Sequence, residues 1–132
     1  MKCLIVEDDR VSSSVLTKMF SRFGSSDVVV NGRIAVEQFR LAHDSNSPYD
    51  LILMDIRMPE VDGLKAVQEI RELEALLGIS RVHRVKVIMT TALDDPRTVM
   101  KALYESDANS YLTKPIILQE LEDKLRALRL IS

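Results

Sequence analysis

The sequence predicts an α/β fold, a doubly wound (βα)5 sandwich in which five βα units build one parallel sheet with helices on both faces. Short runs rich in Ile, Val and Leu alternate along the chain with longer segments of helical periodicity. Nearly continuous apolar runs are typical of strands that helices cover on both sides. The chain of 132 residues has the size of one ordinary domain and can bury a core without disulfides or structural metals. We therefore expect a single domain over residues 1–132.

The strands follow from the apolar runs, and the helices follow from apolar stripes between them. We expect strands at Lys2–Val6, Asp27–Val30, Leu51–Met54, Lys86–Thr90 and Ser110–Leu112. The helical stripes are Val11, Val15, Met19 and Phe23; Ala35, Val36 and Phe39; Leu64, Val67 and Ile70; Val99, Ala102 and Leu103; and Leu118, Leu121, Leu125 and Leu128. The last stripe spans barely two heptads, so it fits a face packed on the sheet better than a coiled-coil seam.

Charge and composition narrow the class of protein. A formal net charge of -2 and a pI near 5.7 provide no basic surface for a phosphate backbone, so nucleic acid is not expected as a direct partner. The single cysteine, Cys3, lies in the apolar run KCLIV; it fits a core side chain and a reducing compartment. No apolar segment resembles a signal peptide or approaches the length of a membrane span. We expect a soluble, cytoplasmic protein that has no direct contact with a membrane.

Acidic residues follow two of the predicted strands. In an open parallel sheet, ligands bind beyond the carboxyl ends of the strands. The first strand runs into VEDDR and the third into LILMDIRMPEVDG, which places Asp8, Asp9 and Asp55 at one edge. Carboxylates that converge repel one another unless a cation is present. Mg2+, with Mn2+ as an alternative, is the expected ion because it takes oxygen ligands and leaves positions for a phosphate oxygen.

A hydroxyl and an ammonium complete this edge. The fourth strand ends in the pair Thr90 and Thr91, and Lys114 follows the fifth strand in YLTKP. Carboxylates, a divalent metal, a hydroxyl and an ammonium can together receive a phosphoryl group, with Asp55 as the nucleophile. Each element alone has a plainer explanation: an Asp pair after a strand is often a helix N-cap, and a loop lysine is often solvated. Their position at the same end of four strands favours the functional interpretation.

The motifs LIVEDD, DLILMDIRMPEVDG, VIMTTA and YLTKP resemble, in order and spacing, those of the receiver domain of two-component response regulators, the family that includes the chemotaxis response regulator. The resemblance covers essentially the whole chain. It implies a flavodoxin-like sheet of strand order 2-1-3-4-5. It also implies a signalling switch that takes a phosphoryl group from a phosphohistidine on a sensor histidine kinase or phosphotransfer protein. Such a protein catalyses its own phosphorylation but has no turnover substrate.

The resemblance also implies roles for single residues. Asp55 would be the phosphoacceptor and a metal ligand. Asp9 would bind Mg2+ directly, Asp8 would help through water, and the backbone carbonyl of Arg57 would be a further ligand. We expect these groups to form the metal site.

The switch would use residues of the last two strands. Thr91, which Ala92 follows, would be the switch hydroxyl, Lys114 the phosphate partner and Tyr111 the aromatic switch. Side chains alternate along a strand, so only one of two consecutive threonines can face the aspartates; we expect Thr91, with Thr90 as the alternative. Tyr111 would rotate inward into the space that Thr91 vacates.

Three residues would shape the loops by the same resemblance: Pro59, Gly63 and Pro115, the last with a cis peptide bond before it. One departure lies before the fifth strand, where receivers usually carry Gly-Ala and this chain has SDANSY. Asp107 stands at the glycine position, and Asp is among the few residues that tolerate a positive φ if the turn requires it.

Two other functions share parts of this pattern. A phosphatase of the haloacid dehalogenase type also uses a strand-end Asp and Mg2+, but it needs a second Asp two residues later, where Arg57 stands. A flavodoxin-like FMN carrier needs a phosphate loop rich in Ser, Thr and Gly, whereas EDDRVSSS begins with carboxylates.

For the switch, we expect the signal to leave through the face of the fourth helix, fifth strand and fifth helix, including a possible phosphorylation-dependent dimer.

Overall fold

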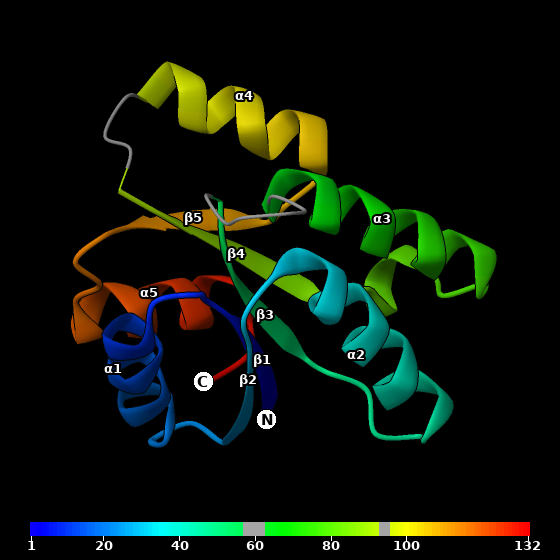
Figure 1. Ribbon diagram of the computed structural model, residues 1–132, viewed down its shortest axis with the longest axis horizontal. Helices are drawn as coiled ribbons and strands as arrows, with labels where there is room; N and C mark the ends of the chain where they lie inside the picture. Colours follow the sequence, from blue (N-terminus) through cyan, green and yellow to red (C-terminus); the bar gives the residue numbers. More distant parts are fainter. Residues whose placement is uncertain (57–62, 93–95) are drawn as a thin grey trace.

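The computed structural model describes residues 1–56, 63–92 and 96–132, which form five strands, five α-helices and one 3-10 helix (Figure 1). The strands are β1 (Lys2–Val6), β2 (Ser25–Val29), β3 (Leu51–Asp55), β4 (Lys86–Thr91) and β5 (Ser110–Thr113). The helices are α1 (Arg10–Phe20), α2 (Gly32–Asp44), α3 (Gly63–Leu76), η1 (Arg81–His83), α4 (Pro96–Ser106) and α5 (Leu118–Ala127).

The five strands form one parallel sheet of order β2-β1-β3-β4-β5, which confirms the predicted fold class. β3, β4 and β5 each continue one residue beyond the predicted end, and β2 begins two residues earlier, at Ser25. The reason for the shift in β2 is backbone pairing: the Ser25 amide donates to the Met1 carbonyl, and a polar residue can make this bond as well as an apolar one.

Two apolar cores cover the two faces of the sheet, because side chains of each strand alternate between them. Leu4, Val6, Ile52 and Met54 point to the core under α2 and α3. The intervening residues of β1 and β3 join Leu16 and Phe20 of α1 and Leu121 and Leu125 of α5. Cys3 lies fully inside this second core, as expected, and burial raises the pKa of its thiol above the ordinary value.

Most predicted helical stripes face the sheet. The stripe members that are buried are Ala35, Phe39, Val67, Ile70, Val99, Ala102, Leu121 and Leu125. Leu128 is partly buried against the same core as Leu121 and Leu125. The last stripe of the chain therefore packs on the sheet, as predicted.

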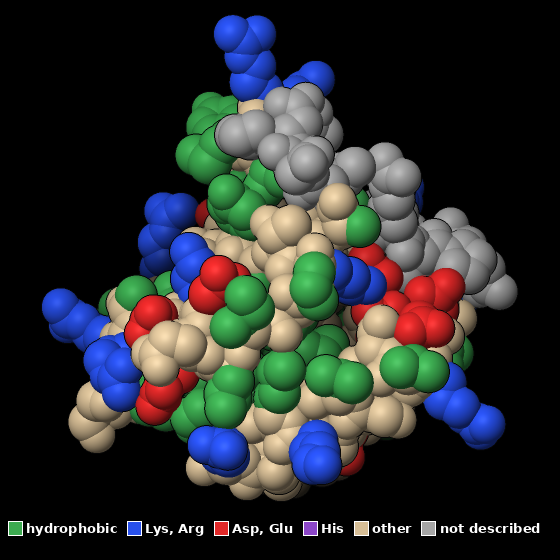
Figure 2. Space-filling model, turned by 90° about the vertical axis from the view of Figure 1, so that its left-hand side faces the viewer, with side chains coloured by type: hydrophobic (Ala, Val, Ile, Leu, Met, Phe, Trp, Pro, Cys, Tyr) green, Lys and Arg blue, Asp and Glu red, His purple; other side chains and the backbone are tan. Residues whose placement is uncertain are grey.

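The stripe predicted for α1 is correct in one half and wrong in the other: Met19 and Phe23 are partly buried against the second core, but Val11 and Val15 are not. Val11 is 71% exposed and Val15 is 45% exposed, whereas Leu16 and Phe20 are buried. The helix begins after its N-cap Asp9 and ends at Phe20, so Phe23 lies beyond it. The rotation of the helix turns the pair Leu16 and Phe20 inward and leaves both valines in solvent. Figure 2 looks onto the side where α1 and α5 lie in Figure 1, and hydrophobic side chains gather in the lower half of that view.

The turn between α4 and β5 has the backbone conformation that the sequence departure suggested. Asp107 has φ 60, in the left-handed region.

The described helices include none that is long and apolar enough to cross a membrane.

Candidate functional site

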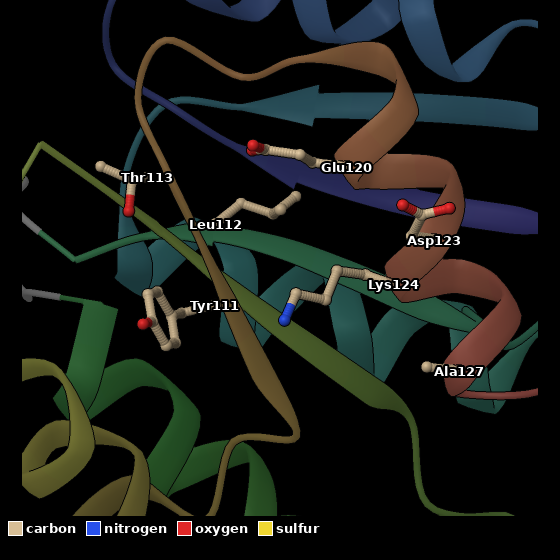
Figure 3. Close-up of a pocket in the computed structure, with 7 residues that line it drawn as sticks. All are labelled: Tyr111, Leu112, Thr113, Glu120, Asp123, Lys124 and Ala127. Atoms are coloured by element: carbon tan, nitrogen blue, oxygen red, sulfur yellow. The ribbon is translucent and has the colours of Figure 1, made fainter. Parts of the chain in front are cut away.

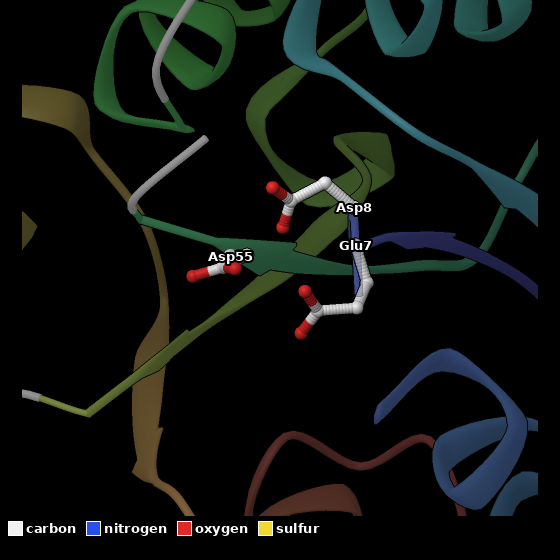
Figure 4. Close-up of side chains that lie close together, drawn as sticks. All are labelled: Glu7, Asp8 and Asp55. Atoms are coloured by element: carbon white, nitrogen blue, oxygen red, sulfur yellow. The ribbon is translucent and has the colours of Figure 1, made fainter. Parts of the chain in front are cut away.

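Three carboxylates meet beyond the carboxyl ends of β1 and β3. Glu7 and Asp8 follow β1 directly, and Asp55 is the last residue of β3. One carboxylate oxygen from each lies within 4.8 Å of the others (Figure 4). Glu7 and Asp55 are buried, and Asp8 is exposed. The site therefore has two shielded carboxylates and one that opens to solvent.

Lys114 is the cation of this group. Its Nζ donates to Oε1 of Glu7 at 2.6 Å and to Oδ2 of Asp55 at 3.2 Å. The lysine follows β5, where its amide donates to the Thr91 carbonyl at 2.7 Å, and the Lys114–Pro115 bond is cis, as expected. Burial acts to lower the pKa of Lys114, but the bond to Glu7 and the charge of Asp55 outweigh it and raise the pKa above its ordinary value. Lys114 is therefore held charged.

Asp9 lies outside this cluster, and its role as a direct metal ligand stays a prediction. Its Oδ2 accepts hydrogen bonds from the amide and the hydroxyl of Ser12, at 2.9 Å and 2.7 Å, so it is the N-cap of α1. The bond from the Ser12 hydroxyl, then that from the Ser12 amide, lowers the pKa of Asp9. The plainer explanation of an Asp after a strand, helix capping, thus applies to Asp9.

Sequence reasoning missed Glu7. Its Oε2 also accepts from the Asp9 amide at 3.1 Å, so the carboxylate is fixed on both oxygens. Two signals in the sequence could have found it. Glu7 and Asp8 are the first residues after the apolar run, and Asp9 stands next to the start of the first helical stripe, where Asp is a preferred N-cap.

The two threonines of β4 face opposite sides of the sheet, as alternation requires. Thr90 is the register partner of Asp55, and Ile88, two residues before it, belongs to the core under α1 and α5. Thr91 is on the other face, with Tyr111, which packs against the core under α2 and α3. Both threonines are buried, and Ala92 is exposed. Which hydroxyl meets a phosphoryl group stays a prediction.

Tyr111 lies on β5 at the wall of a hollow between β5 and α5 (Figure 3). The hollow has a volume of about 500 Å3 and is also lined by Thr113, Glu120, Asp123 and Lys124. The ammonium of Lys124 lies 5.8 Å from the centre of the tyrosine ring. The aromatic side chain is therefore half-buried and reachable from outside.

Gly63 begins α3 directly against the backbone at the end of β3. The Gly63 amide donates to the Ile56 carbonyl at 3.0 Å, and a Cβ at this position would lie 2.1 Å from the Asp55 carbonyl oxygen. A glycine is needed because α3 begins against the backbone of the proposed nucleophile. Arg57 and Pro59, also predicted site residues, lie outside the described residues.

The charges of the cluster suit a divalent cation. Three carboxylates face one ammonium, so the cluster has an excess of negative charge. Carboxylate oxygens are the ligands that Mg2+ takes, usually with retained waters, and the exposed Asp8 leaves a side open for them. The donor set therefore fits the expected ion.

Comparison with known families agrees with this geometry. The profile of the response regulator receiver domain matches residues 3–126. The chain belongs to this family. As a receiver domain it is a component of two-component signalling, and its acidic pocket occupies the end of the sheet that the strand order predicts.

Two curated relatives illustrate the range of proteins that this receiver resembles. It is 31% identical over 122 residues to two-component response regulator 24 of Arabidopsis thaliana, covering 92% of this chain and 78% of that protein. It is 37% identical over 121 residues to regulatory protein AtoC of Escherichia coli, covering 91% of this chain and 23% of AtoC. The receiver thus spans less than a quarter of several longer relatives, AtoC and hybrid histidine kinase L of Dictyostelium discoideum among them.

Two solved structures are similar to this receiver. One is the receiver domain of Ssk1 from Saccharomyces cerevisiae, crystallised with the histidine phosphotransfer protein Ypd1. It has 27% identity and a TM-score of 0.81, with 94% of this chain and 85% of that chain covered. The other is the receiver domain of the histidine kinase CKI1 from A. thaliana complexed with Mg2+. It has 25% identity and a TM-score of 0.82, with 96% and 90% covered.

Proposed function

We propose that this protein is a phosphorylation-operated switch in which Asp55 accepts a phosphoryl group from a phosphohistidine of a histidine kinase or phosphotransfer protein. The observation that supports it most is the bond of 3.2 Å between Lys114 Nζ and Asp55 Oδ2 beside the two acidic residues that follow β1. A nucleophilic carboxylate, a fixed ammonium and a cation site at one sheet edge are what phosphoryl transfer to a carboxylate requires.

Asp8 and Asp55 are the proposed ligands of Mg2+, or of Mn2+ in its place, with Glu7 completing the acidic cluster. The carbonyl of Arg57 is proposed as a further ligand. The CKI1 receiver complexed with Mg2+ supports this choice of ion. When bound, the metal supplies positive charge where a phosphoryl group approaches carboxylates.

The chemistry uses Asp55 and Lys114. An Oδ atom of Asp55 attacks phosphorus, an O–P bond forms as the N–P bond to the donor histidine breaks, and the electron pair stays on the imidazole nitrogen. The Lys114 ammonium gives up its hydrogen bond to Asp55 and pairs with a phosphoryl oxygen. Glu7 acts on the lysine rather than on phosphorus, because its bond of 2.6 Å holds Nζ beside the acceptor.

We propose that the switch lies in β4 and β5. The Thr91 hydroxyl turns toward the phosphoryl group, and the small Ala92 leaves room beside it. Thr91 and Tyr111 share one face of the sheet, so movement of one changes the space that the other can fill. A few kcal/mol between two such states is enough for one phosphate contact to bias them.

The donor is proposed to dock on α1. Val11, Val15 and Ile116 line an apolar groove of about 160 Å3 that also reaches Lys114, and both valines are exposed. A partner that brings an imidazole to Asp55 must rest beside this groove, so an apolar helical face around its histidine fits. The Ssk1 receiver crystallised with a phosphotransfer protein supports this class of partner.

The reader is proposed to bind on α4, β5 and α5. Met100 is 60% exposed and Tyr104 is 90% exposed on α4, and the hollow beside Tyr111 lies on the neighbouring elements. A second copy of the chain is the other expected occupant of this face after phosphorylation.

The test is to incubate the protein with Mg2+ and acetyl phosphate and to locate added phosphate by mass spectrometry. We expect one phosphate on Asp55, none on Asp55→Asn, and normal labelling of Asp44→Asn, a control at an exposed aspartate of α2. Equal labelling of Asp55→Asn would refute the assignment. Continuous release of phosphate at enzymatic rates, instead of one retained group, would point to a phosphatase.

A further inference from the structure

A second charged cavity lies at the opposite end of the sheet from the acidic cluster. It has a volume of about 240 Å3 and is lined by Arg71, Arg81, Arg84, Val85, Lys86, Asp107 and Asn109. Val85 and Lys86 lie at the amino end of β4, and Asn109 directly precedes β5. The cavity is several times larger than the roughly 30 Å3 that one water molecule occupies in the liquid.

Part of the cavity is a rigid floor. Arg71 donates to Glu74 Oε1 at 2.7 Å, to the Val85 carbonyl at 2.8 Å and to Asn109 Oδ1 at 3.0 Å. Glu74 is buried, and its other oxygen accepts from the Val85 amide at 2.8 Å. These hydrogen bonds occupy the Arg71 guanidinium. A ligand would therefore meet the charges of the other basic side chains, Arg81, Arg84 and Lys86, which form the rim of the cavity.

The rim has more positive than negative charge. Arg84 Nη2 donates to Asp107 Oδ2 at 2.6 Å, and Arg81 Nη2 reaches the same oxygen only at 3.9 Å. Within the described residues, no acidic side chain pairs with the ammonium of Lys86. Four basic side chains therefore share two carboxylates, Glu74 and Asp107, and the excess of two charges faces solvent.

We propose that this cavity binds a small phosphate dianion. The charge of such an ion matches the excess, and the fork of a guanidinium fits phosphate oxygens in pairs. Arg84 is already held in place, because its side chain is only 20% exposed and also lies 3.7 Å from Glu74. Arg81 and Lys86 would close on the ion from the rim. Inorganic phosphate and a small phosphate monoester have the same dianionic chemistry, so either is a candidate ligand.

The basic cavity is separate from the acidic cluster at Asp55. Removing divalent metal distinguishes phosphate binding at the two sites. With EDTA present, the acidic cluster repels phosphate, so binding then reports the basic cavity. We would titrate inorganic phosphate, and in a second arm glycerol phosphate, against chloride of equal ionic strength and follow the amide NMR signals of Val85, Asp107 and Asn109. Shifts limited to this cavity are expected, and the tighter ligand identifies the source.

Two variants test the assignment in opposite directions. Arg81→Gln with Lys86→Gln should raise the Kd by roughly tenfold or more, as expected when two charge-assisted contacts are lost. Asp107→Asn should lower the Kd, because it removes the anion that competes for Arg81 and Arg84. Lys101→Gln, on α4 outside the cavity, should change nothing. Equal phosphate affinity in all four proteins, or shifts spread over the whole surface, would overturn the proposal.

Discussion

Lys114 links the carboxylate of Glu7, which follows β1, to that of Asp55, which ends β3, so one ammonium bridges two members of the acidic cluster. Glu7 and Asp55 are almost fully inaccessible to solvent, so both carboxylates depend on hydrogen bonds and charges within the protein. A buried acceptor that loses its donor bears the full cost of its desolvation.

We expect Lys114→Ala to lower the free energy of unfolding by about 1–3 kcal/mol. Mg2+ should restore part of the loss, because the cation can replace the missing positive charge. Urea unfolding with EDTA and with millimolar Mg2+ measures both effects. Lys101→Ala, at a solvent-exposed lysine, is the matched control, and an equally small loss in both variants would contradict the role of Lys114.

Asp8 and Asp9 are adjacent residues with different proposed roles. The stabilisation by Mg2+ should respond differently to substitution of each. Asp8→Asn should abolish the stabilisation by metal, which is roughly 1–3 kcal/mol for a site near saturation. Asp9→Asn should keep it, because Asn caps a helix about as well as Asp and the bonds from Ser12 belong to the cap. Melting temperatures with and without Mg2+ decide this. Loss of the metal effect in Asp9→Asn alone would restore the ligand set that the sequence suggested.

At the scale of elements, α3 is pressed against the end of β3. The contact is between backbones, at Gly63 and the carbonyl of Asp55, so no side chain can move aside to relieve a clash. The start of α3 thereby fixes where the proposed nucleophile ends its strand.

Gly63→Ala should lower the free energy of unfolding by about 1–3 kcal/mol, since overpacking shifts the backbone. It should also slow labelling by acetyl phosphate, because the carbonyl of Asp55 must move. Glu72→Ala, on the exposed side of the same helix, controls for changes in helix propensity. Unchanged stability together with normal labelling would show that the helix start is not so constrained.

The turn between α4 and β5 depends on an ion pair and should therefore respond to pH. The hydrogen bond from Arg84, supported by the charges of Arg84, Arg71 and Arg81, lowers the pKa of Asp107 below its ordinary value of 3.8. A lowered pKa in the folded state gives stability that is present above the ordinary value and is lost as pH falls through the folded value.

Asp107→Asn should therefore be less stable than the parent near neutral pH, and the difference should shrink as pH falls below 3.8. Asn tolerates the positive φ at this position. The substitution therefore removes the charge of Asp107 without straining the turn. Unfolding by urea at several pH values gives the difference. A gap that stays constant down to acid pH would exclude the ion pair as its cause.

Elements with one clear pattern could be predicted from the sequence, and elements with two competing patterns could not. The strands of the sheet are apolar runs, and β3 and β4 were placed within one residue because both faces are buried. In α1, Val11 and Val15 have the same spacing as Leu16 and Phe20, and only packing against α5 and the sheet decides which pair turns inward. In the acidic segment, the sequence signals for Glu7 and for an N-cap at Asp9 were present, but the hydrogen bonds that assign each residue are seen only in the structure.

At the scale of the whole molecule, the sheet separates two cores that differ in their helices. Phe20→Ala should lower the free energy of unfolding by about 3–5 kcal/mol, because it empties a buried aromatic site. Val15→Ala, on the same helix but exposed, should change it by less than about 0.5 kcal/mol while slowing transfer from a phosphohistidine donor. Denaturant unfolding and a transfer assay together test the inner and outer faces of α1, and similar losses of stability in both variants would contradict the observed rotation.

The opposite placement of the acidic cluster and the basic cavity has a consequence for how partners arrive. The cluster beyond β1 and β3 has an excess of negative charge, and the cavity at the amino ends of β4 and β5 has an excess of positive charge, so these two sites create fields of opposite sign at the two ends of the sheet. Such fields exert a torque on an approaching charged protein before contact. A donor with a basic rim around its histidine would be turned toward Asp55 during the encounter, and added salt would slow that association by shortening the range of the field.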